Sequence, residues 1–329
     1  MPLLEYAKAF YHWKFKGSTR VPYVPEDIAL EVTNVCNFRC KFCPQSLPSH
    51  QLLAPNRFLS RSDASTIFKV LRDGGVKSKT IHYTLDGEPF SNRKFNEICE
   101  AGRDHGFTTA IFSTNGFFCT PGRLKELPAG VKYVLCIDFC DDRSYFESYR
   151  GTPNSWQVVL SNILSSADRI SDTTFRITDI SSFTIREPQE LQKRYEALKA
   201  RFAKLNSVKV GQRIFHNATG LIQINGKAPS KKYHRCPYPW TSMVIASNGD
   251  VVACCRDLEH RTVLGNLLHQ SLEAIWNGES MQAMREALVM QLPDTISACA
   301  GCDLPYDSGK FSAKHLVSTA VTRLNVFGA

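Results

Sequence analysis

Short apolar runs rich in β-branched residues alternate with longer amphipathic segments between residues 27 and 213. The runs expected to form strands are residues 28–33, 80–85, 108–113, 133–137, 174–180 and 208–213. The segments expected to form helices include residues 65–71, 95–103, 156–167 and 188–202. This alternation is typical of repeated βα units around a parallel sheet. It predicts an α/β fold with a partial (β/α)6 barrel of the TIM type, whose functional residues follow the carboxyl ends of the strands.

The rest of the chain is expected to form smaller parts around this barrel. We expect an N-terminal helical segment packed on the barrel, the barrel, a linker, a small C-terminal α+β module and a tail, at residues 1–26, 27–213, 214–235, 236–310 and 311–329. The linker is rich in Gly, Asn and Lys. The module contains a hairpin signal at residues 247–250 and a helical stretch near residues 272–288.

Composition limits the compartment and the partners. No stretch approaches the roughly 18 apolar residues of a membrane-spanning helix, and no signal-peptide core is present, so we expect a cytoplasmic protein without a membrane partner. Disulfides are rare in that compartment, so the twelve cysteines must serve metal binding, catalysis or burial. Lys and Arg exceed Asp and Glu by 40 to 31, a net charge of +9 that favours anionic partners.

Three cysteines follow the first expected strand in the spacing C-x3-C-x2-C: Cys36, Cys40 and Cys43. Three thiolates can bind three irons of a four-iron cluster and leave the fourth iron open to an outside ligand. A structural zinc site would instead close with a fourth ligand, and His50 is available for that role. The spacing alone leaves both interpretations open.

With Phe42 directly before the last cysteine, this motif resembles the radical S-adenosylmethionine superfamily. The resemblance implies that the open iron binds the amino and carboxylate groups of S-adenosylmethionine. It also implies that an electron from the cluster cleaves this cofactor to a 5'-deoxyadenosyl radical, which abstracts a hydrogen atom from the substrate. A flavodoxin or ferredoxin-type electron donor is expected as a partner.

Three later turns resemble cofactor-binding motifs of that superfamily, in the same order. One resembles a GGEP turn with Asp86 in place of Gly, the second resembles a TNG turn, and the third resembles an S-x-D segment with Cys136 in place of Ser. Arg150 follows the third motif, and the resemblance implies that it binds the cofactor carboxylate. The alternative for Arg150 is a surface ion pair with Asp141 or Glu147. The cofactor-binding residues that the resemblance implies are Phe42, Asp86, Gly87, Glu88, Pro89, Ser113, Asn115, Cys136, Asp138 and Arg150.

A second cysteine set lies in the last third of the chain, at Cys236, Cys254, Cys299 and Cys302. With the hairpin around Gly249 and a later SLEAIW segment, this set resembles the SPASM extension of the superfamily over residues 236–303. The resemblance implies one auxiliary four-iron cluster with four protein ligands, and so two four-iron clusters in all. The spacing from Gly249 favours Cys254 over Cys255 as a ligand, and zinc is the alternative metal.

The substrate is less constrained. The first cluster cysteine is residue 36, which leaves no room upstream for a leader-peptide domain and favours a small substrate, such as an anionic sugar, nucleoside or nucleotide-linked metabolite. Candidate contacts are Arg176, Arg186 and Arg213, and candidate catalytic residues are Cys140, Cys255 and Asp179. Peptide or protein modification and a non-catalytic zinc or iron–sulfur module are the alternatives. Nucleic acid is not expected, because no basic patch is interleaved with aromatic residues.

Overall fold

The computed structural model describes residues 3–53, 55–224 and 232–306. Within these residues, nine strands form one sheet in the order β6-β5-β4-β3-β2-β1-β7-β8-β9. The strands are β1 (Asp27–Leu30), β2 (Thr80–Tyr83), β3 (Thr109–Thr114), β4 (Lys132–Phe139), β5 (Thr173–Asp179), β6 (Val208–Gln212), β7 (Ser242–Ile245), β8 (Asp250–Val252) and β9 (Val263–Asn266). Strands β1 to β6 pair in parallel, as the alternation of strands and helices predicts.

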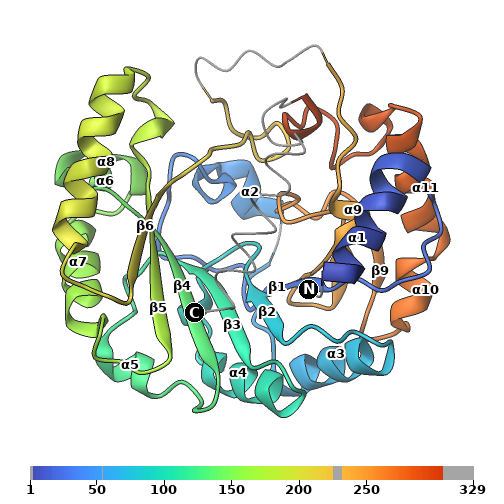
Figure 1. Cartoon of the computed structure of the whole chain (residues 1–329), viewed down its shortest axis with the longest axis horizontal. Helices are drawn as coiled ribbons and strands as arrows, with labels where there is room; N and C mark the ends of the chain where they lie inside the picture. The colour runs from blue at the N-terminus through green and yellow to red at the C-terminus, as the bar shows by residue number, and fades with distance from the viewer. Residues whose placement is uncertain (1–2, 54, 225–231, 307–329) are drawn as a thin grey trace.

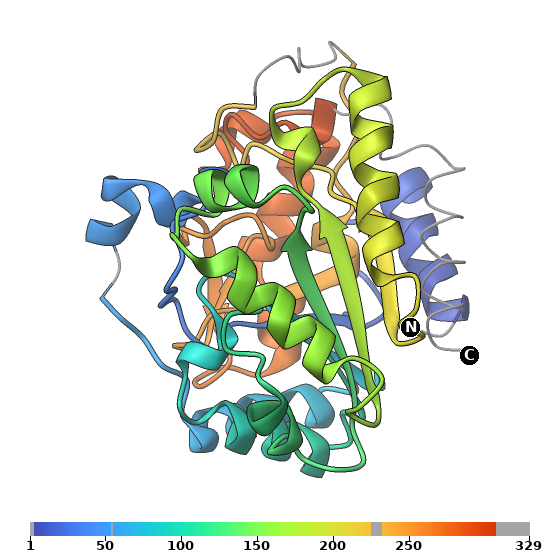
Figure 2. The same cartoon turned by 90° about the vertical axis from the view of Figure 1, so that its left-hand side faces the viewer.

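Helices fill the connections between these strands. They are α1 (Leu3–Tyr11), α2 (Pro48–Leu53), α3 (Arg61–Asp73), α4 (Phe95–Asp104), α5 (Pro121–Lys125), α6 (Arg143–Arg150), α7 (Ser155–Ser166), α8 (Pro188–Phe202), α9 (Tyr238–Thr241), α10 (Leu272–Trp276) and α11 (Glu279–Val289). Helices α3, α4, α5, α7 and α8 lie along the outer side of the sheet (Figure 1). In Figure 2, α7 and α8 lie in front of the strands that they cover. No described helix is both long and apolar enough to cross a membrane.

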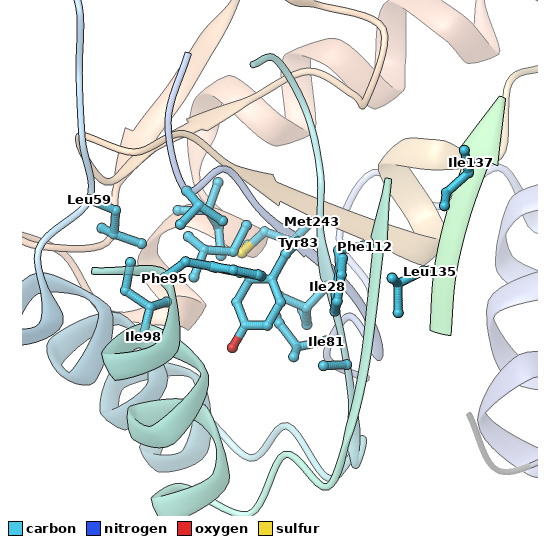
Figure 3. Close-up of a cluster of buried hydrophobic side chains, with 14 of the residues drawn as sticks. Ile28, Leu59, Ile81, Tyr83, Phe95, Ile98, Phe112, Leu135, Ile137 and Met243 are labelled. Atoms are coloured by element: carbon cyan, nitrogen blue, oxygen red, sulfur yellow. The ribbon is translucent and has the colours of Figure 1, made fainter. Parts of the chain in front are cut away.

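The strands separate an apolar outer face from a polar inner face. Tyr83, Phe95 and Phe112 meet edge to face, with ring centroids 5.5 and 5.4 Å apart, between the sheet and α4 (Figure 3). Successive side chains of a strand point to opposite faces. Ser113 and Cys136, which neighbour buried Phe112 and Leu135 along their strands, therefore face the inside of the partial barrel.

The C-terminal strands extend the barrel sheet and do not form a sheet of their own. Strand β7 pairs in parallel with β1, with Ala29 opposite Val244, and β8 and β9 add antiparallel strands beyond it. Met243 of β7 lies in the same buried cluster as Ile28 of β1 (Figure 3). Because β7 is parallel to β1 and β8 is antiparallel to β7, β8 ends toward the edge of the sheet where β1 begins.

The segments before and after the barrel also lie against the C-terminal part. Helix α1 packs on α9, and the indole Nε1 of Trp13 donates to the carbonyl of Arg235 at 3.0 Å. The same segment also contacts the barrel, where Glu26 accepts from the Lys77 N–H at 3.1 Å. Within the expected linker, Asn217 donates to the carbonyl of Gly301 at 2.7 Å, so residues 214–224 are part of the packed structure. Residues 225–231 of the linker, residues 307–310 of the module and the tail at 311–329 lie outside the described residues.

The helical stretch expected near residues 272–288 is two helices. Helix α10 ends at Trp276 and α11 begins at Glu279, with Gly278 between them. A Cβ at Gly278 would lie 2.1 Å from the carbonyl oxygen of Ala274, so the backbone comes too close there for any side chain. The break lets α11 turn back against α9.

Arg285 on α11 joins these C-terminal helices to the N-terminal segment. The side chain is fully buried, donates to the carbonyls of Pro239 at 2.9 Å and Thr19 at 2.7 Å, and lies over the ring of Trp276. The hydrogen bond to Pro239 is buried and the one to Thr19 is partly buried, so losing the donor has a cost at both carbonyls.

We therefore expect Arg285→Met to lower the free energy of unfolding by about 3 kcal/mol, because the carbonyls of Pro239 and Thr19 lose their donor. Urea denaturation of the purified protein measures this change. Arg20→Met is the matched control: Arg20 forms an ion pair with Glu273, but their side chains are 67% and 58% exposed, so the loss should stay below about 1 kcal/mol. Equal losses in the two variants would contradict the assignment.

Candidate functional site

A cavity of about 310 Å³ lies at the carboxyl ends of the barrel strands. Many of the residues predicted from the motifs line it: Cys36, Cys40, Phe42, Cys43, Gly87, Glu88, Ser113, Asn115, Cys136, Asp138, Arg150, Arg213 and Cys255. Phe38, at a variable position of the cysteine motif, also lines the cavity. Other lining residues lie outside the motifs, among them Thr84, Phe215, His216 and Leu258, and the sequence offered no signal for them.

The three cysteines after β1 lie in a loop that wraps against the end of α6. The Cys43 N–H donates to the Cys40 carbonyl at 2.9 Å, and the Lys41 N–H donates to the Tyr149 carbonyl at 2.8 Å. Burial, followed by the nearby charge of Glu88, raises the pKa of Cys36 to about 12, and burial also raises the pKa of Cys40 and Cys43. Such thiols stay protonated until a cation replaces the proton.

The turn after β2 is tied to the turn after β3 by one buried carboxylate. Glu88 is 1% exposed; its Oε2 accepts from the Asn115 N–H at 2.6 Å and its Oε1 accepts from the Thr114 hydroxyl at 2.8 Å. Burial raises the pKa of Glu88, and these hydrogen bonds oppose the rise. Asn115 in turn donates to Asn37 in the cysteine loop at 2.7 Å. Three motifs that are separate in the sequence thus form one hydrogen-bonded unit.

The residue that departs from the usual turn, Asp86, lies behind the cavity wall. Its Oδ1 accepts from Gln45 Nε2 at 2.9 Å, and its Oδ2 lies 2.8 Å from His50 Nε2. Burial alone would lower the pKa of His50, but the hydrogen bond and charge of Asp86 outweigh burial and raise it. His50, which the sequence left open as a zinc ligand, is therefore the partner of Asp86. Pro89 begins a short buried 3-10 turn and also lies outside the lining.

The inner face of the sheet carries a row of polar side chains. Ser113 is opposite Cys136, and Cys136 is opposite Arg176, whose side chain hydrogen-bonds the Cys136 thiol. Two residues further along β4, Asp138 lies 3.0 Å from Arg213 Nη1 and 3.6 Å from Arg150 Nη1.

Arg150 is buried, so it does not form the surface ion pair with Asp141 or Glu147 that was the alternative to cofactor binding. It is 5% exposed, and its guanidinium lies 5.2 Å from the ring of Phe38 and 5.8 Å from that of Phe42. Burial alone would lower its pKa, but the surrounding acidic groups, with Cys40 and Asp138 first among them, raise it. Glu147, one of the expected surface partners, pairs with Arg143 at 3.2 Å.

The structure does not bring three other candidates to the cavity. Cys140 is 1% exposed, and its thiol donates to the Asp142 carbonyl at 3.4 Å. Asp179 is 3% exposed and accepts from the N–H and hydroxyl of Ser181 at 2.9 and 2.7 Å, so it anchors the turn after β5. Arg186 donates to the Phe183 carbonyl at 3.0 Å.

The second cysteine set forms a buried group. Negative charge on one thiol of this set raises the pKa of its neighbours, as Cys299 and Cys302 do for Cys236 and as Cys302 does for Cys299. Cys236 and Cys299 act in the same way on Cys254. The Cys302 N–H donates to the Cys299 carbonyl at 3.0 Å. Burial raises the pKa of Cys299 to about 12. Of the adjacent pair, Cys254 interacts with this set, whereas Cys255 lines the barrel cavity and hydrogen-bonds the side chain of Tyr238.

The donors of both sets suit a cluster better than a single ion. Among the described residues, no three His, Cys, Asp or Glu side chains surround a point that one metal ion could occupy. Tetrahedral zinc needs that convergence, with Zn–S distances near ~2.3 Å. In a four-iron cluster each thiolate binds a different iron, so the thiolates are spread more widely. Both donor sets consist of free thiols alone, which are the ligands of iron–sulfur clusters, so the residues present fit such clusters.

A thiol loop at the mouth of a partial barrel, with a second buried thiol set beside it, defines an α/β protein built for iron–sulfur chemistry. Residues 30–194 match the model of the radical SAM superfamily, and residues 236–303 match the SPASM iron–sulfur cluster-binding domain. The chain belongs to the radical SAM superfamily and is a radical SAM enzyme with a C-terminal SPASM domain. The resemblance seen in the motifs is confirmed, and a non-catalytic module is excluded.

Among curated relatives, a probable GTP 3',8-cyclase of Saccharolobus islandicus (strain M.14.25 / Kamchatka #1) is 27% identical over 143 residues, 44% of each chain. A GTP 3',8-cyclase of Actinobacillus pleuropneumoniae serotype 5b (strain L20) is 27% identical over 165 residues, 49% of this chain and 45% of the relative. The chain matches less than half the length of these relatives.

Solved structures share the fold. BtrN in complex with AdoMet and 2-DOIA has a TM-score of 0.53 at 17% identity, covering 85% of this chain and 94% of BtrN. Native anSMEcpe with bound AdoMet has a TM-score of 0.55 at 13% identity, covering 91% and 98%. SuiB of Streptococcus suis bound to S-adenosylmethionine has a TM-score of 0.53 at 15% identity, covering 83% and 70%. The predicted α/β partial barrel with a C-terminal module is confirmed.

Gly87 offers a direct test of the cofactor turn. Its φ is +69°, and a Cβ there would lie 2.2 Å from the Thr33 carbonyl oxygen, just before the cysteine loop. We expect Gly87→Ala to weaken S-adenosylmethionine binding at least tenfold in equilibrium binding to anaerobically reconstituted protein, because the turn and the loop cannot both keep their places.

The control is Gly75→Ala, where φ is +94° but no atom lies within 4 Å of the added Cβ. That variant has only the backbone strain of about 1–2 kcal/mol and should bind the cofactor normally. Normal binding by Gly87→Ala would show that the turn is not part of the cofactor site.

Proposed function

We propose that this enzyme uses two four-iron clusters and S-adenosylmethionine to start radical chemistry on an anionic small molecule. The ligands proposed are Cys36, Cys40 and Cys43 for the first cluster and Cys236, Cys254, Cys299 and Cys302 for the auxiliary cluster. When bound, the first cluster and the cofactor supply a 5'-deoxyadenosyl radical that abstracts a hydrogen atom from the substrate. A flavodoxin or ferredoxin-type protein is proposed as the electron donor.

The cavity walls have the groups that such a cofactor needs. Gly87 and Glu88 belong to the turn proposed to hold the methionine amino group, and Arg150 is proposed to bind the carboxylate. Because a thiol is a weaker hydrogen-bond partner than a hydroxyl, Cys136 in place of Ser leaves more of this binding to the Arg150 guanidinium. The rings of Phe42 and Phe215, whose centroids are 5.0 Å apart, help to exclude water.

The charge balance at the rim carries the proposal of an anionic substrate. Asp138 is shared between Arg150 and Arg213, and Glu88 is occupied by hydrogen bonds within the wall. The charges of the two lining arginines, Arg150 and Arg213, therefore balance those of Glu88 and Asp138, and Arg176 beside Cys136 adds one positive charge. One anionic partner is the cofactor carboxylate. Arg213 lines the cavity with its side chain 37% exposed, and we assign it to an anionic group of the substrate.

The nature of that anionic group follows from the same rim. A phosphate or carboxylate suits the planar fork of an arginine, so sugar, nucleoside and nucleotide-linked metabolites are the proposed class. The GTP in the names of the two relatives belongs to this class. Cys255, beside a proposed cluster ligand and in the cavity lining, is proposed as a hydrogen-atom or proton partner.

The cofactor assignment is tested by anaerobic reconstitution with iron and sulfide counted per chain, followed by reduction with dithionite in the presence of S-adenosylmethionine. We expect about eight irons per chain and formation of 5'-deoxyadenosine. Replacing Cys36, Cys40 and Cys43 together by Ala should leave about four irons and abolish 5'-deoxyadenosine, because the radical site is lost. Zinc in place of iron, without cofactor cleavage, would refute the proposal.

The substrate class is tested with charged and neutral members of matched pairs, GTP with guanosine and UDP-glucose with glucose. We expect an anionic member to raise the rate of 5'-deoxyadenosine formation and its neutral partner to have little effect. Arg213→Gln should raise the KM for the active anion at least tenfold, about 1.4 kcal/mol of binding, and Arg213→Lys should restore part of it. Stimulation by a leader-bearing precursor peptide, with none by the anions, would support the peptide alternative instead.

A further inference from the structure

Arg256 directly follows the adjacent cysteines Cys254 and Cys255, and its side chain is 6% exposed. A guanidinium is always charged, and burying a charge is costly unless the surroundings compensate it. No part of the proposed cofactor or substrate site uses this residue. Its burial therefore calls for another explanation.

The contacts of Arg256 are with the auxiliary cysteine set. Its backbone N–H donates to the Cys254 sulfur at 3.4 Å, and its side chain hydrogen-bonds the Cys302 thiol. Arg256 therefore hydrogen-bonds two of the four proposed ligands.

Asp303 provides a partial counter-charge. Its Oδ1 lies 3.1 Å from Arg256 Nη1, and it directly follows Cys302 in the chain. Asp303 also accepts from the Asn217 N–H at 3.3 Å, so it has a second donor besides Arg256. Arg256 is the member of the ion pair whose side chain hydrogen-bonds the Cys302 sulfur.

We propose that the Arg256–Asp303 ion pair sets the reduction potential of the auxiliary cluster, with Arg256 raising the potential and Asp303 lowering it. The proposal rests on the ligand set given under the proposed function. Reduction adds one electron, and so one negative charge, to a cluster held by four thiolates. A fixed positive charge and hydrogen bonds at the sulfurs stabilise the more negative state, and both act strongly where water is excluded.

A merely structural role for the ion pair makes a different prediction. If Arg256 and Asp303 only hold two loops together, removing either partner breaks the same contact and has the same kind of effect. If their charges tune the cluster, removing the arginine lowers the potential and removing the aspartate raises it. Opposite shifts from the two halves of one ion pair are specific to tuning.

The experiment is a redox titration followed by electron paramagnetic resonance on the full-length, reconstituted enzyme. The variant lacking Cys36, Cys40 and Cys43 serves to assign the signal of the auxiliary cluster. At the wild-type midpoint, Arg256→Gln should lower the ratio of reduced to oxidised cluster at least tenfold, about 59 mV for one electron. Asp303→Asn should raise this ratio several-fold, and Arg256→Lys should stay within threefold of wild type because it keeps the charge.

Arg72→Gln is the matched control. Arg72 is a partly buried arginine on α3 that donates to the His105 carbonyl at 2.6 Å, among the barrel helices. Its removal should leave the potential unchanged. If Arg256→Gln fails to assemble its cluster, Asp303→Asn and Arg256→Lys still test the proposal. Asp303→Asn must raise the ratio of reduced to oxidised cluster, and Arg256→Lys must leave it within threefold of wild type.

The two proposals fail in different ways. A wild-type enzyme with about four irons and no second signal would overturn the ligand set. Two clusters with no shift in Arg256→Gln and Asp303→Asn, or with shifts in the same direction, would leave the ligand set standing and overturn the tuning by this ion pair.

Discussion

The parallel pairing of β7 with β1 is the contact on which the arrangement of both cysteine sets depends. It attaches β8 and the loop after it, with Cys254 and Cys255, to the barrel sheet, and Cys255 lines the same cavity as Cys36, Cys40 and Cys43. The cavity consequently has walls from both ends of the chain. Without this pairing the C-terminal strands would not continue the barrel sheet.

Charged groups around the thiols occur in compensated pairs. Asp86 lies against His50, Asp138 is shared by two arginines, and Arg256 contacts Asp303. A buried pair adds little net stability compared with apolar residues of the same size, but losing one partner leaves an unpaired charge at considerable cost. Such pairs fix the positions of neighbouring loops. They also leave local electric fields in which clusters and charged ligands are stabilised.

The sequence predicts the local features of this molecule well. Apolar runs mark the six parallel strands, and turns rich in Gly, Pro and Asn mark the places where cofactor motifs follow strands, because hydrophobic periodicity and turn geometry are decided by a few neighbouring residues. Most motif residues accordingly line one cavity. Gly278 is the sequence signal for the break in the C-terminal helical stretch, because glycine favours helix ends over helix interiors.

The features that were missed depend on contacts between distant residues. Nothing near Asp86 shows that its partner is His50, and nothing near Glu88 shows that its oxygens bind the turn at Asn115. Cys140 and Asp179 follow their strands as expected, yet their side chains point into protein because neighbouring turns supply their hydrogen-bond partners. The pairing of β7 with β1 likewise joins two short apolar runs, and nothing in either run specifies which other strand it pairs with.

The same edge pairing has a consequence for how the chain reaches its native state. Asp27 of β1 is opposite Ser242 of β7, so one side of an early strand is completed by one of the last strands to be synthesised. Contacts between residues so far apart in sequence slow folding, because a long loop must close before they form. Until then β1 presents an unpaired edge, on which another chain could add a strand. The nascent barrel therefore depends on protection during synthesis, and the order of events on the ribosome constrains this molecule as much as its finished packing does.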